Sequence, residues 1–185
     1  SILPTLFVLG YFVFFPDPPV SRVLYVISRF FFIGLPILWT LFVEKKKFPL
    51  PRFSQKGMRA GILTGLAVGI TAMILYINVF ANILDLSEVN NKTSQLGFGG
   101  KNFLFFALFV IIMNSSLEEY FWRWFNFSKL KEVCKLPWAL TLTGIGFGLH
   151  HVVILLVFFN WWQGLFFGFS VGVGGVIMAF LYHKY

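Results

Sequence analysis

Charged residues are scarce in this chain of 185 residues, of which 12% are charged and 58% hydrophobic. Soluble domains carry roughly 25% charged residues, so this composition excludes an ordinary soluble domain and predicts an integral membrane protein. Acids are the scarcer sign, with 7 Asp and Glu against 15 Lys and Arg, a formal net charge of +8. The excess of bases lies in short loops between apolar segments. That distribution is typical of membrane-topology signals, and it does not indicate a nucleic-acid partner.

Cysteine is almost absent, because Cys134 is the single one in the sequence, and this excludes an intrachain disulfide. There is no His-Glu-x-x-His spacing and no cysteine pair, so the common zinc signatures are missing. Apolar sequence starts at once after Ser1, with no basic segment and no cleavage site, which does not match an intact signal peptide. We therefore expect the chain to begin inside a longer protein and, because Tyr185 directly follows a hydrophobic span, to end inside one as well.

Six apolar segments predict membrane-spanning helices, which need about 20 mostly apolar residues. The fold class is therefore all-α, a polytopic transmembrane helical bundle that forms a single domain over 1–185. The first segment is short, and the others are separated by polar loops, the longest of which is 85–101. The segments are 1–15, 20–43, 60–84, 103–127, 136–159 and 162–182.

Lysine and arginine gather in alternate loops. Loops 44–59 and 128–135 are rich in Lys and Arg, and Lys184 adds a charge near the C-terminal end. By the positive-inside rule these two loops and the C-terminal end face the cytoplasm. The alternation along six spans also supports the number of spans.

Glycines recur every four residues in the last two predicted spans. Gly144 and Gly148 lie in one, and Gly164, Gly168 and Gly172 lie in the next. Small residues at this spacing let helix backbones approach closely in lipid. We expect these two spans to pack tightly against each other.

Two adjacent carboxylates and an arginine interrupt the apolar span 103–127. Charged side chains are costly in hydrocarbon, so Glu118, Glu119 and Arg123 are candidates for function. Glu119 and Arg123 are four residues apart and share a helix face, which predicts an ion pair. Glu118 is turned about 100° away from Glu119 and is the candidate general base. The alternative is that all three residues form a structural salt-bridge cluster.

The next predicted span carries adjacent histidines, His150 and His151, with Phe147 four residues before the second. The Phe147 ring is expected to pack against His151, and only one of the two imidazoles is expected to share a pocket with Glu118. A glutamate and a histidine on neighbouring helices can polarise a water molecule, with or without a metal. Glu118, His150 and His151 could also supply the three ligands of a catalytic zinc, but the spacing does not decide the cofactor.

Other polar residues in the spans have milder interpretations. Asn114, Ser115 and Ser116 lie one turn before Glu118 and could orient it, and Arg29 is expected to face another helix or to snorkel. The tryptophans are expected in interfacial belts. Counting 1.5 Å per residue from the expected span ends places Glu118 about 10 Å nearer the cytoplasmic side than His151. The tryptophans are Trp122, Trp124, Trp138, Trp161 and Trp162.

These motifs resemble those of the CPBP family, the CAAX proteases and bacteriocin-processing membrane proteins, also called ABI proteins. The family's first motif, Glu-Glu-x-x-x-Arg, is matched by Glu118, Glu119 and Arg123. Its second motif, Phe-x-x-x-His, is matched by Phe147 and His151 on the next span. The resemblance covers 103–185, which we expect to be the core that carries the motifs.

The resemblance implies an intramembrane endopeptidase that works in or beside the lipid bilayer. Glu118 and His151 would activate the attacking water, while Glu119 and Arg123 would support the geometry. The substrate implied is a prenylated C-terminus, a leader peptide or a membrane-protein segment. Members are described both as metalloproteases and as metal-independent glutamate proteases. The family's third motif, His-x-x-x-Asn or His-x-x-x-Asp on a following helix, is expected beyond Tyr185.

Two functions of other classes fit the same residues. The chain could be a non-catalytic scaffold or an accessory subunit of a larger membrane complex, with the Glu, Arg and His residues in a structural role. A weaker alternative is ligation of a pigment or haem by His150 or His151.

Overall fold

A computed structural model describes residues 2–15, 17–47, 54–95, 100 and 102–185, and all regular structure in these residues is helical. Four helices are plain α-helices: α3 (Gln55–Asn78), α4 (Leu86–Gln95), α8 (Leu136–Phe158) and α9 (Trp161–Lys184). Two others end in a π-helical turn: α1 (Leu3–Leu9) continues as η1 (Gly10–Phe14), and α2 (Pro18–Leu38) as η2 (Trp39–Val43). A short 3₁₀ turn, η3 (Phe80–Asn82), follows α3.

One long helix contains the acidic motif. It runs from Asn102 to Val133 and alternates between α-helical and π-helical stretches. Its parts are α5 (Asn102–Phe109), η4 (Val110–Asn114), α6 (Ser115–Glu118), η5 (Glu119–Phe127) and α7 (Ser128–Val133). The wider π-helical turns are rare in proteins and often mark functional sites. Here η5 begins at Glu119 and carries Arg123.

Five helices of the described residues are long and apolar enough to cross a membrane, and Leu3–Phe14 is a shorter apolar helix. The prediction of an all-α, multi-pass membrane protein is therefore confirmed. Three boundaries were wrong. Segment 128–135, predicted as a loop, is α7 plus a two-residue turn, and segment 85–101 contains α4. The third predicted span begins earlier, at Gln55, because Ser54 caps it by accepting a hydrogen bond from the Gly57 N–H at 3.1 Å. The rest of loops 44–59 and 85–101 lies partly outside the described residues.

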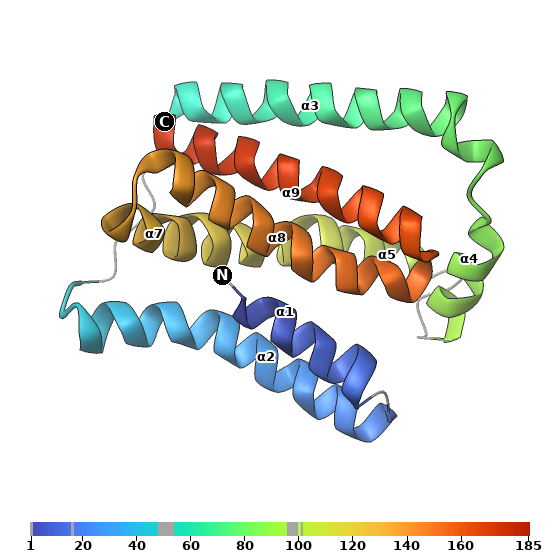
Figure 1. Cartoon of the computed structure of the whole chain (residues 1–185), viewed down its shortest axis with the longest axis horizontal. Coiled ribbons are helices and arrows are strands. Elements are labelled where there is room, and N and C mark those ends of the chain that lie inside the picture. Colours follow the sequence, from blue (N-terminus) through green and yellow to red (C-terminus); the bar gives the residue numbers. More distant parts are fainter. Residues whose placement is uncertain (1, 16, 48–53, 96–99, 101) are drawn as a thin grey trace.

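Helices α8 and α9 form the tightest contact, as Figure 1 shows for the two adjacent orange and red ribbons. A Cβ built on Gly148 would lie 3.0 Å from the Gly168 carbonyl oxygen, and one built on Gly172 would lie 3.0 Å from the Gly144 oxygen. These distances are tighter than nearly all real Cβ contacts, so the predicted close contact at the glycines is confirmed. A capping box between Asn160 and Gln163 starts α9 immediately after the turn.

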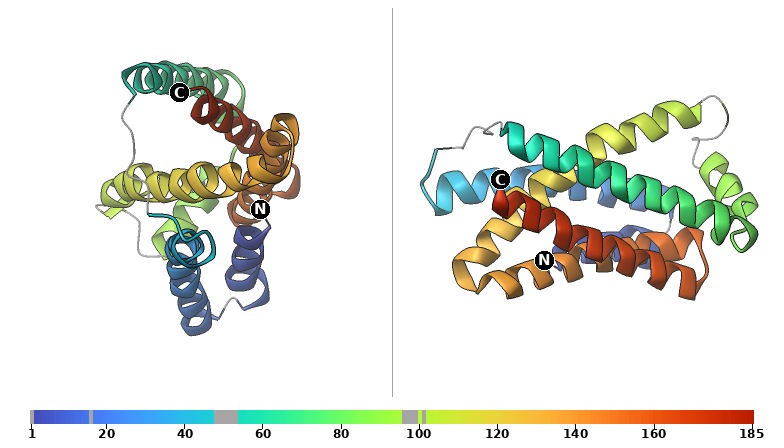
Figure 2. Two further views of the ribbon diagram at one scale, coloured as in Figure 1. Left: turned by 90° about the vertical axis from the view of Figure 1, so that its left-hand side faces the viewer. Right: turned by 90° about the horizontal axis from the view of Figure 1, so that it is seen from above.

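The other helices surround this pair unevenly. The end-on view in Figure 2 places α3 on one side and the α1–α2 pair on the other, with the long helix crossing between them. Helix α1 packs on α8, and α2 packs on η5. Helix α3 contacts α9, yet none of its residues is buried. The sequence motifs thus lie on the elements at the centre of the molecule.

Candidate active site

The long helix and α8 bring Glu118 to both histidines. Its Oε1 atom lies 3.9 Å from His151 Nε2 and 4.0 Å from His150 Nε2. All three side chains are largely buried. The expectation that only one imidazole would lie near Glu118 was wrong, because the carboxylate reaches both rings, whose centroids are 4.0 Å apart.

The tautomer of His151 follows from its second hydrogen bond. Its Nδ1 atom is 2.8 Å from the Phe147 carbonyl oxygen, which can only accept. Nδ1 therefore carries a proton, and in the neutral imidazole Nε2 presents a lone pair toward Glu118. The Phe147 ring also packs against this imidazole, with centroids 4.6 Å apart, as the sequence predicted.

Glu118 Oε1 and His151 Nε2 are thus two hydrogen-bond acceptors that face each other at 3.9 Å. Ionised carboxylates and unprotonated ring nitrogens cannot bond to each other directly. A polar separation beyond 3.5 Å is typical of a position where a water molecule bridges. The geometry suits a small hydrogen donor, or a cation, between the two atoms.

The remaining residues of the two motifs contact one another in sequence. Arg123 Nη1 lies 3.3 Å from Glu119 Oε1, so the predicted ion pair is present. The Arg123 guanidinium also stacks over the Phe147 ring at 4.4 Å from its centroid, and this arginine is almost fully buried. Arg123 therefore ties the first motif to the second, because Phe147 in turn holds His151.

Trp122 packs against His150. Its indole is fully buried and stacks on the imidazole with centroids 5.4 Å apart and planes 16° apart. The expectation of an interfacial position was therefore wrong for Trp122, whereas Trp138 and Trp161 are exposed. Trp122 lies in a π-helical stretch on the side that faces α8, a placement that no sequence pattern indicated.

Two more residues reach Glu118 from its other side. Asn114 donates from Nδ2 to Glu118 Oε1 at 2.8 Å, and Arg29 donates from Nη1 to Asn114 Oδ1 at 3.1 Å. Asn114 was a candidate from the sequence, but Arg29 was not connected with the site. Ser115 and Ser116 do not orient the carboxylates, because their hydroxyls donate to backbone carbonyls of their own helix.

The expected 10 Å difference in depth between Glu118 and His151 was wrong. The helix that carries Glu118 continues through α7 to Val133 instead of ending at 127. Fifteen residues therefore separate each of the two from the Cys134–Lys135 turn, since α8 begins at Leu136. Equal numbers of residues on the two sides of the turn place the two groups at the same height.

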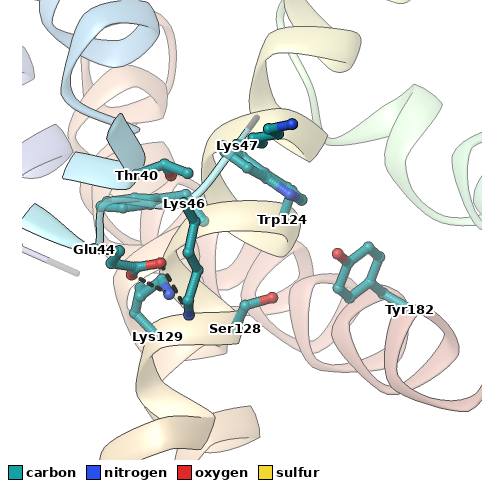
Figure 3. Close-up of a pocket in the computed structure, with 9 residues that line it drawn as sticks. Thr40, Glu44, Lys46, Lys47, Trp124, Ser128, Lys129 and Tyr182 are labelled. Carbon is teal, nitrogen blue, oxygen red and sulfur yellow. Dashed lines mark ion pairs between the residues drawn. The ribbon is translucent and has the colours of Figure 1, made fainter. Parts of the chain in front are cut away.

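A separate pocket of about 230 Å³ lies at one end of the bundle, where η2, α7 and α9 meet (Figure 3). Glu44 accepts from Lys129 and lies 3.3 Å from Lys46 Nζ. The hydrogen bond from Lys129 holds the pKa of Glu44 below its usual value. The basic segments that the charge alternation places on one side of the membrane thus gather at one end. The pocket is lined by Thr40, Glu44, Lys46, Lys47, Trp124, Phe125, Ser128, Lys129 and Tyr182.

In this multi-pass helical membrane protein, a carboxylate and two imidazoles are grouped between the helices, an arrangement that can activate a water molecule. Residues 100–185 match the family described as Type II CAAX prenyl endopeptidase Rce1-like. The match covers the C-terminal part of the chain and supports its assignment to the CPBP family of CAAX proteases, which at the coarse level are membrane proteases with peptide or protein substrates. No curated protein and no solved structure matches the chain.

Proposed function

We propose that the protein is an intramembrane endopeptidase in which Glu118 and His151 activate the water that attacks a peptide bond. The observation that supports this most is the pair of facing acceptors, Glu118 Oε1 and His151 Nε2, 3.9 Å apart. A water that donates to both atoms is held with its oxygen lone pairs directed away from them. A positioned acceptor within reach of the water's proton is what general-base catalysis requires.

The reaction then proceeds as an addition followed by an elimination. The water oxygen bonds to the carbonyl carbon of the substrate while its proton passes to Glu118. The carbon–nitrogen bond breaks next, and the proton on Glu118 passes to the departing amine. His151 keeps its proton on Nδ1, which donates it in the hydrogen bond to Phe147 O. Its Nε2 atom accepts a hydrogen bond from the water throughout. The first products are a carboxylic acid, which retains the second proton of the water, and an amine, so atoms and charge balance. The acid then loses its proton to the amine or to solvent.

Glu118, His150 and His151 also form a donor set that would suit a divalent metal such as zinc. One donor atom from each lies within 4.8 Å of the others, and two imidazoles with one carboxylate make a common catalytic zinc set. Two ligands on one zinc lie at most about 4.2 Å apart, twice the usual metal–nitrogen distance. The three side chains would therefore need to draw together slightly. A bound metal would supply a Lewis acid and lower the pKa of its water.

The substrate class that the family description favours is a prenylated peptide. We propose a farnesylated C-terminus as the first substrate to test, with a leader peptide and a membrane-protein segment as further choices. We also propose that the end of the bundle around Glu44, Lys129 and the C-terminal end of α9 faces the cytoplasm, since its lysines match the positive-inside rule.

The central test replaces the acid. The purified protein in detergent is given a farnesylated, internally quenched peptide that ends in a CAAX sequence. We expect Glu118→Ala to lower kcat by about a thousandfold or more, as loss of an essential group typically does. Glu132→Gln, which alters an exposed acid on α7, should cleave at the wild-type rate. Wild-type cleavage by a folded Glu118→Ala protein would overturn the assignment of the base.

A chelator separates the two forms of this mechanism. If a metal is required, dialysis against a chelator abolishes cleavage and added zinc restores it, and His150→Ala behaves like the chelated protein. If Glu118 and His151 act on water alone, the chelator leaves kcat unchanged and His150→Ala is milder than His151→Ala. Metal analysis of the purified protein provides a readout that does not depend on activity.

A further inference from the structure

Arg29 lies well inside α2, one of the helices long enough to span the membrane. A cation at such a position is costly and needs a partner. In the described part of the chain no carboxylate lies within ion-pair distance of Arg29. Its guanidinium rests over the Tyr25 ring, 4.6 Å from the centroid, and Nη1 donates to Asn114 Oδ1 at 3.1 Å.

Asn114 passes this interaction on to the acid. Its amide has an acceptor at one end and donors at the other. Only the oxygen can accept from Arg29, and only the nitrogen can donate to the Glu118 carboxylate, at 2.8 Å. The two bonds therefore run in one direction, from a cation through an amide to an anion. Hydrogen bonds with a charged partner are stronger, and bonds in a chain polarise one another.

The atom at the end of this chain is Glu118 Oε1, the same oxygen that faces His150 and His151. Resting on the proposed function, we infer that Arg29 and Asn114 are positioning residues for the catalytic acid. They fix the rotamer of Glu118 so that Oε1 faces the histidines, and the charge of Arg29 acts on the carboxylate through the Asn114 amide. The N-terminal half of the chain thereby contributes to a site whose family motifs all lie in the C-terminal half.

A purely structural role would look different, and the chain offers a matched control for it. Tyr120 donates from its hydroxyl to the Ile33 carbonyl oxygen at 3.0 Å. This bond joins the same two helices as the Arg29–Asn114 bond, but it does not touch Glu118. If the polar links serve only to hold α2 against the long helix, Tyr120→Phe and Asn114→Ala should behave alike.

The kinetic test uses the farnesylated quenched peptide. We expect Asn114→Ala to lower kcat about 10- to 100-fold, the usual effect of removing a partner that orients a catalytic ligand, with KM nearly unchanged. Arg29→Met should lower kcat in the same direction, and Arg29→Lys should recover part of the loss. The double variant should be no slower than Asn114→Ala alone, because Arg29 acts through Asn114. Tyr120→Phe should keep the wild-type kcat.

Two kinetic results would overturn the inference. One is an equal fall in kcat for Tyr120→Phe and Asn114→Ala. The other is a double variant in which the two losses multiply, because residues that act independently give additive free energies. Either result could occur while Glu118→Ala is inactive, and then only the positioning role fails. If Glu118→Ala is as active as the wild type, the proposed function itself fails.

Infrared spectroscopy tests the same chain without a substrate. The carboxylate stretch of Glu118 is identified as the band that Glu118→Gln removes. We expect this band to shift in Asn114→Ala and in Arg29→Met, and to stay in place in Tyr120→Phe. A band that does not move when Asn114 is removed would contradict the inference, whatever peptide the protein cleaves.

Discussion

The last two spans and the second span are held to the centre of the molecule by different kinds of contact. Helices α8 and α9 meet through glycine backbones, with atoms so close that a methyl group at Gly148 or Gly172 would push against the backbone of the other helix. Helix α2 is joined to the long helix by polar links, Arg29 to Asn114 and Tyr120 to the Ile33 carbonyl. In lipid, close packing and interhelical hydrogen bonds both contribute to helix association. Close packing here fixes the position of His151, and the link from Arg29 through Asn114 fixes the direction of Glu118.

Helix α3 shows that glycine spacing alone does not create such a contact. Gly61, Gly65 and Gly69 repeat every four residues as in α8 and α9, yet no atom lies within 4 Å of a Cβ built on any of them. In the described part of the chain, the same glycine pattern therefore packs against a neighbouring helix in α8 and α9 but has no close neighbour in α3. The same glycine substitution made in α8 and in α3 separates the effect of helix–helix packing on stability from the effect of the substitution on the helix itself.

The largest effect is expected from Gly148→Leu. The new side chain would enter the backbone of α9, and overpacking of this kind costs about 3 kcal/mol or more when the obstacle is backbone. Gly65→Leu, in the open stripe of α3, should change the free energy of unfolding by less than about 0.5 kcal/mol. Thermal unfolding in detergent measures both. Equal losses for the two variants would show that the α8–α9 contact is not the tight one.

A smaller effect, directed at the site, is expected from Gly175→Ala. A Cβ there would lie 2.9 Å from Phe147 Cδ1, so the ring must shift. The Phe147 ring contacts both Arg123 and His151. We expect cleavage to fall about tenfold, since displacements near 1 Å can cost up to a hundredfold, with only a modest loss of stability. Gly174→Ala has open space around it and should leave cleavage unchanged; a similar fall there would contradict the explanation.

The smallest effect is expected at a third polar link, between Glu44, which directly follows η2, and Lys129 of α7. The pKa of Glu44 is lowered from its ordinary 4.5 chiefly by the hydrogen bond from Lys129. A carboxyl with a lowered pKa stabilises the fold above its ordinary pKa and loses that contribution as the pH falls through the lowered value. Glu44→Gln should therefore reduce the unfolding free energy at pH 7 by less than about 1 kcal/mol. The gap to wild type should close in acid and in high salt, and a gap independent of pH would exclude this cause.

The sequence predicted most of the fold because each signal was local. Twenty apolar residues in a row span a bilayer by length alone, and the glycine repeats in α8 and α9 indicated their contact. Local spacing also predicted the Glu119–Arg123 pair and the packing of Phe147 on His151, since both pairs lie four residues apart on one helix. The predicted helix end after 127 was wrong. The basic residues that follow were interpreted as a loop, but lysines have apolar stems that are compatible with a helix, and the helix continues through α7.

By itself, the sequence determined that the protein is a multi-pass helical bundle and which motif residues lie on which spans, because composition and periodicity act within one helix. Only the tertiary structure decided that both histidines meet Glu118, that Trp122 is buried against His150, and that Arg29 reaches the acid through Asn114. These contacts join helices that are distant in the sequence. Their distances depend on helix tilt, on close approach at glycines and on the hydrogen bonds of buried polar groups. None of these can be deduced from the residue spacing within a single segment.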